Sequence, residues 1–219
     1  MSSFAAARQH MVDGQIRTSD VTDTRILAAM LSLPREAFVP ESQRPLAYLD
    51  LDIALADAPG RYLVKPVVIA RLLQAVDLRE TDKVLVVGCA SGYAAAIAAK
   101  VAAEVVATES DPALAARAKA TLAELGITNV QVEQAAAADG FPAGAPYDVI
   151  VFDGATEVEP EALYRQLGEG GRLAGVFVTT PPSRAMLVTR SQDDFGNRVL
   201  FNIAAPVLPG LERRPEFVF

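Results

Sequence analysis

The sequence predicts an α/β protein with a mostly parallel β-sheet and helices on both faces of that sheet. From Lys83 onwards, short apolar runs alternate with segments of helical periodicity, which is the order of a strand–helix–strand protein. The apolar runs lack the polar alternation of a half-exposed strand, so we expect them to be buried on both faces. Of the 219 residues, 51% are apolar, and no break in composition divides the chain. We therefore expect one domain with a sizeable core.

The chain before Lys83 is expected to be mostly helical. Within residues 1–46, the stretch SDVTDTRILAAMLSLP repeats apolar residues at helical spacing until two prolines stop the pattern. The segment from residue 49 to 66 is short, irregular and punctuated by Pro59 and Gly60, which predicts a loop or a small hairpin. Pro66 suits the first turn of a helix that continues to residue 78.

The alternating part of the chain predicts its elements in order. They are a strand at 83–88, a helix at 91–102, a strand at 104–109, a helix at 111–126, strands at 129–135 and 147–155, a helix at 160–171 and a strand at 172–178. The tail from residue 183 alternates loosely and is expected to add strands at one edge. Sheets of this kind bind ligands at the carboxyl ends of their strands.

Charge and cysteine usage exclude some classes of function. The formal net charge is -7 and no long Lys/Arg cluster occurs, so we expect a protein or small-molecule partner and no nucleic acid. The single cysteine, Cys89, suits a reducing compartment. No stretch approaches 18 consecutive apolar residues, so we expect a soluble, cytoplasmic protein, either a monomer or a homodimer. The only histidine, His10, lies in a polar segment and predicts a surface residue, with no metal site.

The first strand is followed by a turn of small residues, GCASGY. Gly88, Ala90, Ser91 and Gly92 let a ligand approach the backbone, and the start of the next helix offers free N–H donors. Tight strand-to-helix turns favour glycine in any α/β protein, so the turn alone leaves both interpretations open.

Glu109 ends the next strand, roughly 20 residues beyond the turn, where a carboxylate can accept hydrogen bonds from both hydroxyls of a ribose. The alternative is an acid favoured by the dipole of the helix that begins after Asp111. Turn and acid together favour a nucleoside-containing cofactor. A dinucleotide loop would place glycine where Ala90 stands, and no Lys followed by Ser or Thr marks a nucleoside triphosphate site. The pattern is most like an S-adenosylmethionine site.

The chain resembles the protein-L-isoaspartate O-methyltransferase family over almost its whole length. The similar phrases, in the family's order, are MVDGQIRTSDVTDTRILAAMLSLPREAFVPES, AYLDLDIAL, VLVVGCASGYAAAIAA, GITNVQV, APYDVIVFDGA and LYRQLGEGGRLAGV. The resemblance implies a Rossmann-like fold with an N-terminal helical extension. It also implies transfer of a methyl group from S-adenosylmethionine to the α-carboxylate of isoaspartyl residues in damaged proteins. Because the carboxylate is already a nucleophile and the sulfonium a good leaving group, placing and desolvating them is most of the task.

The resemblance also assigns parts of the chain. Residues 1–80 would hold the N-terminal helices and the substrate loop, 81–180 the cofactor-binding core and 181–219 the edge strands. The cofactor would be held by Gly88, Cys89, Ala90, Ser91, Gly92, Glu109, Ser110, Ala136 and Ala137. The substrate would lie against Arg61, Tyr62 and Leu63, with its reacting carboxylate beside Val64 and Lys65. Lys65 could bind that carboxylate as a point charge; the alternative is an exposed loop lysine.

Several positions depart from the family's usual pattern. Val64 stands where a serine normally helps to position the carboxylate. Val86, Cys89 and Ala90 stand at the family's glutamate, threonine and middle glycine. Ala135, Ala136 and Ala137 replace a Gly-Asp-Gly phrase that normally helps to hold the adenine.

Asp139 and Asp153 are nearby acids that could substitute from other positions. A buried polar group that loses its partner costs about 1–3 kcal/mol. The sequence therefore keeps two interpretations: an isoaspartyl methyltransferase, or a non-catalytic descendant that uses the fold to bind a ligand or protein. An NAD-type oxidoreductase has little support, because the loop is wrong and no Tyr/Lys proton relay is evident.

Overall fold

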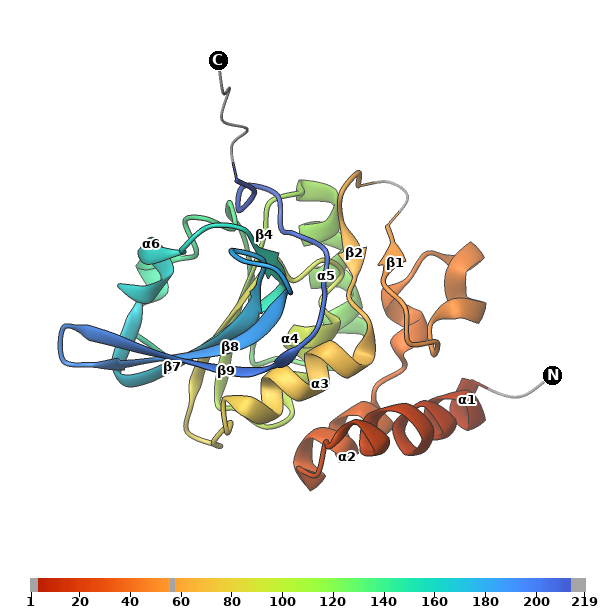
Figure 1. Cartoon of the computed structure of the whole chain (residues 1–219). Coiled ribbons are helices and arrows are strands. Elements are labelled where there is room, and N and C mark those ends of the chain that lie inside the picture. The colour runs from red at the N-terminus through yellow and green to blue at the C-terminus, as the bar shows by residue number, and fades with distance from the viewer. Residues whose placement is uncertain (1–3, 56–57, 214–219) are drawn as a thin grey trace, which may run out of the picture.

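A seven-stranded sheet forms the centre of the molecule (Figure 1). The computed structural model describes residues 4–55 and 58–213. The strand order is β5-β4-β3-β6-β7-β8-β9, in which β3 to β7 are parallel and the last two strands are antiparallel. The strands are β3 (Lys83–Val87), β4 (Glu104–Glu109), β5 (Val130–Gln134), β6 (Tyr147–Thr156), β7 (Leu167–Phe177), β8 (Arg184–Ser191) and β9 (Asp194–Asn202). The mostly parallel sheet with antiparallel strands at its edge confirms the predicted fold class.

The described part of the N-terminal region is largely helical, as predicted. It contains α1 (Phe4–Met11), a π-helical turn (Val12–Ile16), α2 (Thr24–Ser32), and 3₁₀ turns at Arg17–Ser19, Arg35–Phe38 and Glu41–Leu46. The predicted small hairpin is present as β1 (Ile53–Ala54), which pairs antiparallel with β2 (Tyr62–Leu63). It leads directly into α3 (Pro66–Ala75), whose first residue is the proline that suits a first helical turn.

The helices after β3 and β4 begin where local chemistry favours them. The helix α4 (Tyr93–Ala99) follows the small-residue turn, and α5 (Pro112–Glu124) starts behind the N-cap Asp111. The Asp111 carboxylate accepts hydrogen bonds from the backbone N–H groups of Ala113 and Leu114, both at 2.9 Å. This cap satisfies two N–H groups that have no partner within the helix.

The two faces of the sheet are covered differently. One face packs against α3, α4 and α5, with the N-terminal helices outside them. The other face packs against α6 (Glu161–Tyr164), the loop after β5 and two leucines near the C-terminus, Leu208 and Leu211. Alternate residues of the strands enter the two cores, as the two-residue repeat of a strand requires.

The predicted helix over 160–171 is correct only for its first turn. It ends as α6 at Tyr164, and β7 begins at Leu167, which pairs with Tyr147 of β6 before a register shift. The segment LGEGG carries three glycines, each of which costs about 1 kcal/mol in a helix interior. Pairing with β6 therefore prevails over the helical pattern of the preceding residues.

The chain after β9 returns to the sheet. The predicted edge strands are present as β8 and β9, whereas residues 203–213 form a dark blue segment that curves back toward β2 in Figure 1. Its only ladder contact within the described chain is an isolated parallel bridge between Val207 and Ala155 of β6. The segment thus runs beside the carboxyl end of β6, and the remainder of the predicted tail lies outside the described residues.

Candidate functional site

The strand order reverses between the carboxyl ends of β3 and β6, and we call this part of the sheet edge the crevice. The chain leaves β3 toward β4 on one side, while β6 pairs with β3 on the other. This point, where the strand order reverses, is where open α/β sheets bind ligands. The turn after β3, Glu109 at the end of β4 and Asp153 near the end of β6 all meet this edge of the sheet.

The turn after β3 has left-handed backbone at three positions. The φ angles are 70° at Gly88, 51° at Ala90 and 99° at Gly92. At Gly92 an added Cβ would also lie 3.3 Å from the Cβ of Ala118 in α5. Small residues are therefore required here by the turn itself, before any ligand is considered.

The carboxylate of Glu109 is fully buried and receives five hydrogen bonds. Oε2 accepts from Arg61 Nη2 at 2.6 Å and from the Ala90 N–H at 2.7 Å. Oε1 accepts from Arg61 Nε at 3.1 Å, the Asp111 N–H at 3.1 Å and Ser110 Oγ at 3.3 Å. The predicted ribose acid is therefore at the predicted place, but its oxygens already have partners.

Arg61 is the principal partner of Glu109. The arginine comes from the β1–β2 hairpin, is 4% exposed, and makes a two-pronged ion pair with the carboxylate. Its Nη2 also donates to the carbonyl oxygen of Gly88 at 2.7 Å. The structure thus brings Arg61, expected to contact substrate, onto the two residues expected to contact the cofactor.

Leu208 fills the space between the strand ends. A Cβ placed on Gly88 would lie 2.5 Å from Leu208 Cδ2, and one placed on Gly154 would lie 2.7 Å from the same atom. Leu208 is 1% exposed. Its side chain therefore packs directly on the backbone of both glycines. No sequence signal within the tail predicted this contact.

Asp153 is buried in the same crevice without a hydrogen bond. It is 1% exposed, and neither carboxylate oxygen has a partner within the described part of the chain. Burial raises the pKa of Asp153 from 3.8 to about 7, although the positive charges of Arg61 and Arg35 oppose this rise. Burial, with Glu109 and Asp153 adding to it, also raises the pKa of the Cys89 thiol. Cys89 is therefore a neutral thiol near pH 7 and a poor nucleophile.

The predicted substrate loop borders the crevice. Val64 is buried and Lys65 is half-buried, and the Lys65 Nζ lies 3.8 Å from Asp52 Oδ2. The Lys65 N–H also donates to Asp52 Oδ1 at 2.9 Å. Tyr62 and Leu63 form β2, so their backbone pairs with β1.

Arg35 is a buried residue that the sequence analysis missed. It is fully buried, and its guanidinium donates to the carbonyl oxygens of Ala47 at 2.7 Å and Val64 at 2.8 Å. It also lies over the Tyr93 ring, 4.5 Å from the ring centre. Arg35 thereby fixes the backbone of the substrate loop; its only signal in the sequence was the phrase PREAFVPE.

The remaining predicted residues lie around the turn and after β5. Ser91 is buried and donates to the carbonyl oxygen of Phe38. Ala136 is exposed and Ala137 buried in the loop that follows β5, with Asp139 exposed beside them. The side chains of Ala136 and Ala137 have no polar atoms, so they cannot form hydrogen bonds to a ligand.

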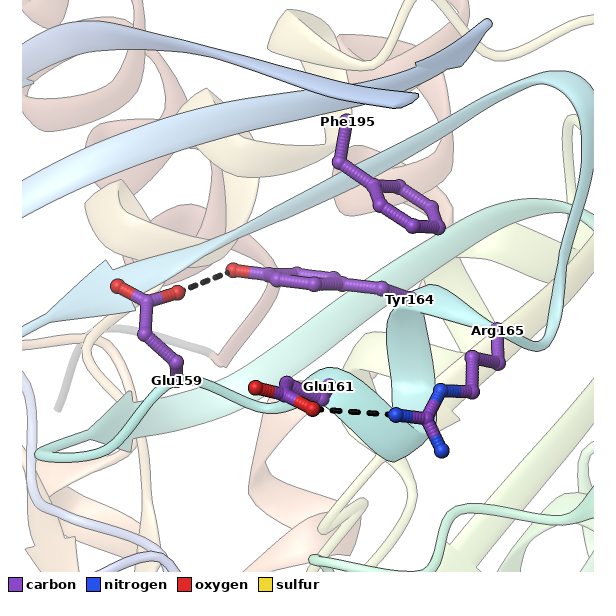
Figure 2. A pocket seen from close by; sticks show the side chains of 5 residues that line it. All are labelled: Glu159, Glu161, Tyr164, Arg165 and Phe195. Carbon is purple, nitrogen blue, oxygen red and sulfur yellow. Dashed lines mark hydrogen bonds and ion pairs between the residues drawn. The ribbon is translucent and has the colours of Figure 1, made fainter. Parts of the chain in front are cut away.

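An open pocket of about 410 Å³ lies elsewhere, at the edge of the sheet (Figure 2). Tyr164 of α6 stacks on Phe195 of β9, with ring centres 5.4 Å apart, and its hydroxyl donates to Glu159 at 2.8 Å. Arg165 and Glu161 pair at 3.1 Å at the rim. The pocket in Figure 2 shares no lining residue with the crevice.

Among the described residues, no group of three or more His, Cys, Asp or Glu side chains is placed to hold a metal ion. Within the same residues, no helix combines the length and apolar character needed to cross a membrane.

Comparison with known proteins decides the family. The model of the protein-L-isoaspartate(D-aspartate) O-methyltransferase family matches residues 6–199. The chain belongs to this family. Protein-L-isoaspartate O-methyltransferase 1 of Rhodopseudomonas palustris (strain HaA2) is 43% identical over 194 residues, which are 88% of this chain and 78% of the relative. Protein-L-isoaspartate O-methyltransferase of Koribacter versatilis (strain Ellin345) is 39% identical over 194 residues, which are 88% of this chain and 85% of the relative.

Solved structures agree with this family membership. A protein-L-isoaspartate O-methyltransferase superposes with a TM-score of 0.81 at 26% identity, over 94% of this chain and 67% of that one. A chain from Plasmodium falciparum in complex with S-adenosyl-L-homocysteine superposes with a TM-score of 0.75 at 17% identity, over 95% and 99% of the two chains. The second likeness establishes the fold.

The backbone of the crevice fits the S-adenosyl cofactor of this family, and the side chains of Arg61 and Leu208 pack against that backbone and Glu109. The left-handed turn, the glycine at the strand end and the buried acid after β4 are the parts that an adenosine and its methionine need. Arg61 and Leu208 occupy the space in front of these parts. Arg61 and Leu208 thus lie directly against the residues that fit the cofactor.

Proposed function

We propose that this chain is an S-adenosylmethionine-dependent O-methyltransferase that methylates isoaspartyl carboxylates in damaged proteins. The observation that carries the proposal is the meeting of the Gly88–Gly92 turn and the buried Glu109 at the switch point of a sheet of this family. A protein or peptide substrate in the cytoplasm, with the enzyme as a monomer or homodimer, fits this function.

When bound, S-adenosylmethionine supplies an electrophilic methyl group. The chain's own residues then have two tasks, binding and exclusion of water. Glu109 can accept hydrogen bonds from sugar hydroxyls once Arg61 leaves it, and Gly88 allows close approach to its backbone because it has no side chain. Since the substrate carboxylate is itself the nucleophile, no general base is required, and most of the rate enhancement comes from orientation.

Lys65 is the residue that we propose for attracting the substrate carboxylate. Its ammonium lies beside Asp52 at 3.8 Å, longer than a hydrogen bond, and its side chain is 23% exposed. It can therefore turn toward an anionic group at small cost. Val64 offers no hydroxyl, so a charged neighbour gains importance in placing the carboxylate.

The test is methyl transfer from labelled S-adenosylmethionine to an isoaspartyl peptide, with the normal aspartyl peptide as control substrate. We expect base-labile methyl ester on the isoaspartyl peptide alone. Replacing Lys65 by Met should raise KM for the peptide about tenfold with a smaller effect on kcat, as expected for lost charge attraction. Lys100→Met, at the exposed end of α4, is the matched control and should leave both parameters unchanged. No ester at millimolar cofactor would refute the proposal.

A further inference from the structure

The crevice is closed by two parts of the chain that are far apart in sequence. One is Arg61, and the other is residues 206–211, which we call the C-terminal plug. The plug is tied to the end of β6 and to the next residue by three backbone hydrogen bonds: Ala155 N–H to the Pro206 carbonyl at 2.8 Å, Leu208 N–H to the Ala155 carbonyl at 2.9 Å, and Glu157 N–H to the Leu211 carbonyl at 2.9 Å. These bonds place Leu208 on Gly88 and Gly154.

Leu208 and an S-adenosyl ligand need the same space. The side chain lies against the backbone of the turn after β3, at the switch point where the ligand of such a sheet binds. Its terminal atoms come within 2.5 Å and 3.1 Å of a Cβ built on Gly88, which leaves no layer of ligand atoms between them. The two occupants are therefore mutually exclusive.

Arg61 competes for the other half of the crevice. A ribose bound at Glu109 would donate its hydroxyls to the same two oxygens that Arg61 now occupies at 2.6 Å and 3.1 Å. The ion pair is almost completely buried. If a ligand displaces Arg61 from Glu109, the guanidinium must therefore pair with another group or become hydrated. Ligand binding and the Arg61–Glu109 pair are thus linked.

We infer that Arg61 and the C-terminal plug form an autoinhibitory closure of the cofactor crevice, which S-adenosyl ligands must displace to bind. The inference rests on the proposed function. Because only the open form binds, the apparent Kd equals the intrinsic Kd divided by the open fraction. Changes that weaken the closure tighten binding, although they remove contacts and add none.

The plug is attached more weakly than the sheet beneath it. Three backbone bonds tie it to Ala155 of β6 and to the adjacent Glu157, and two of them form the single parallel bridge, whereas β6 and β7 pair along most of their length. Such a segment can open without global unfolding. Arg61 directly precedes the two-residue hairpin strand β2 and likewise lies outside the central sheet.

The experiment is calorimetric titration of the full chain with S-adenosylhomocysteine, which binds without turnover. The variants are Leu208→Ala and Arg61→Met, with Leu200→Ala on β9 and Arg79→Met before β3 as matched controls away from the crevice. We expect each crevice variant to bind at least tenfold more tightly than wild type, and both controls to match wild type. Equal affinity in wild type and crevice variants would overturn the closure and leave the proposed function standing.

A second measurement covers the case in which a variant fails to fold. Hydrogen exchange on wild type follows the Leu208 and Leu211 amides, which donate to Ala155 and Leu208 carbonyls. We expect their protection to fall when S-adenosylhomocysteine binds. Unchanged protection in the bound protein would overturn the closure. If neither wild type nor any folded variant binds the ligand at millimolar concentration, the proposed function fails, and the closure fails with it.

Discussion

At the scale of single residues, Glu109 shows how a predicted site residue can acquire a second role. The acid lies at the end of β4, as its place in EVVATE suggested, and Arg61 neutralises it. The partner lies 48 residues earlier in the chain, in a hairpin of irregular sequence. No local pattern relates two positions so far apart, because their approach depends on how the hairpin folds over the sheet. The acid could therefore be predicted from the sequence and its ion pair could not.

The buried Asp153 predicts an unusual pH dependence of stability. Its pKa is raised to about 7 in the folded chain, chiefly by burial, with Glu109 and Asp52 adding to the rise and Arg61 and Arg35 opposing it. Between about pH 4 and 7 the folded state then holds a proton that the unfolded state has lost. The free energy of unfolding should therefore fall by up to about 4 kcal/mol as pH rises through this window. Above about pH 7 it should level off.

Asp153→Asn removes this titration and keeps the shape of the side chain. We expect urea unfolding of the variant to show a flatter dependence on pH between 4 and 7 and greater stability than wild type at pH 8. Asp194→Asn, an exposed aspartate of the β8–β9 hairpin, is the control and should follow wild type. A variant with the wild-type pH slope would show that Asp153 does not carry this proton.

At the scale of elements, the sequence predicted most helices and strands because each carries its own local signal. The strand KVLVV is apolar and buried at every residue after Lys83, while Asp111 and Pro112 mark the start of α5. The failures have a common cause. The pattern over 160–171 looked helical but is divided between α6 and β7, since pairing with β6 decides its second half. The position of the C-terminal plug likewise depends on backbone bonds to β6, which no pattern within the plug's own sequence indicates.

The N-cap of α5 gives a direct test at this scale. Asp111→Ala removes an acceptor for two backbone N–H groups, each at 2.9 Å, and should lower the free energy of unfolding by about 1 kcal/mol. Lys119→Ala, an exposed residue of the same helix, should change it by less than about 0.5 kcal/mol. Urea unfolding midpoints measure both; equal midpoints for the two variants would mean that Asp111 is not a stabilising cap.

At the scale of the whole molecule, the alternation of apolar strands and helices was sufficient to predict the sheet and the edge at which ligands bind. The family resemblance then supplied the chemistry, and the match over residues 6–199 supports it. Occupation of the crevice could not be predicted in this way. It requires Arg61, Leu208 and the β3 turn to meet in three dimensions, and each of these residues looks ordinary in its own segment. Lost side-chain contacts were expected in the cofactor site; a filled site was not.

A crystal structure of the full chain grown with saturating S-adenosylhomocysteine tests the proposed cofactor site and its closure most directly. We expect the ligand between the carboxyl ends of β3 and β6, its ribose on Glu109, with Arg61 withdrawn and Leu208 moved off Gly88 and Gly154. A structure in which Arg61 still pairs with Glu109 and Leu208 still covers both glycines, with the crevice free of ligand at that concentration, would contradict this expectation.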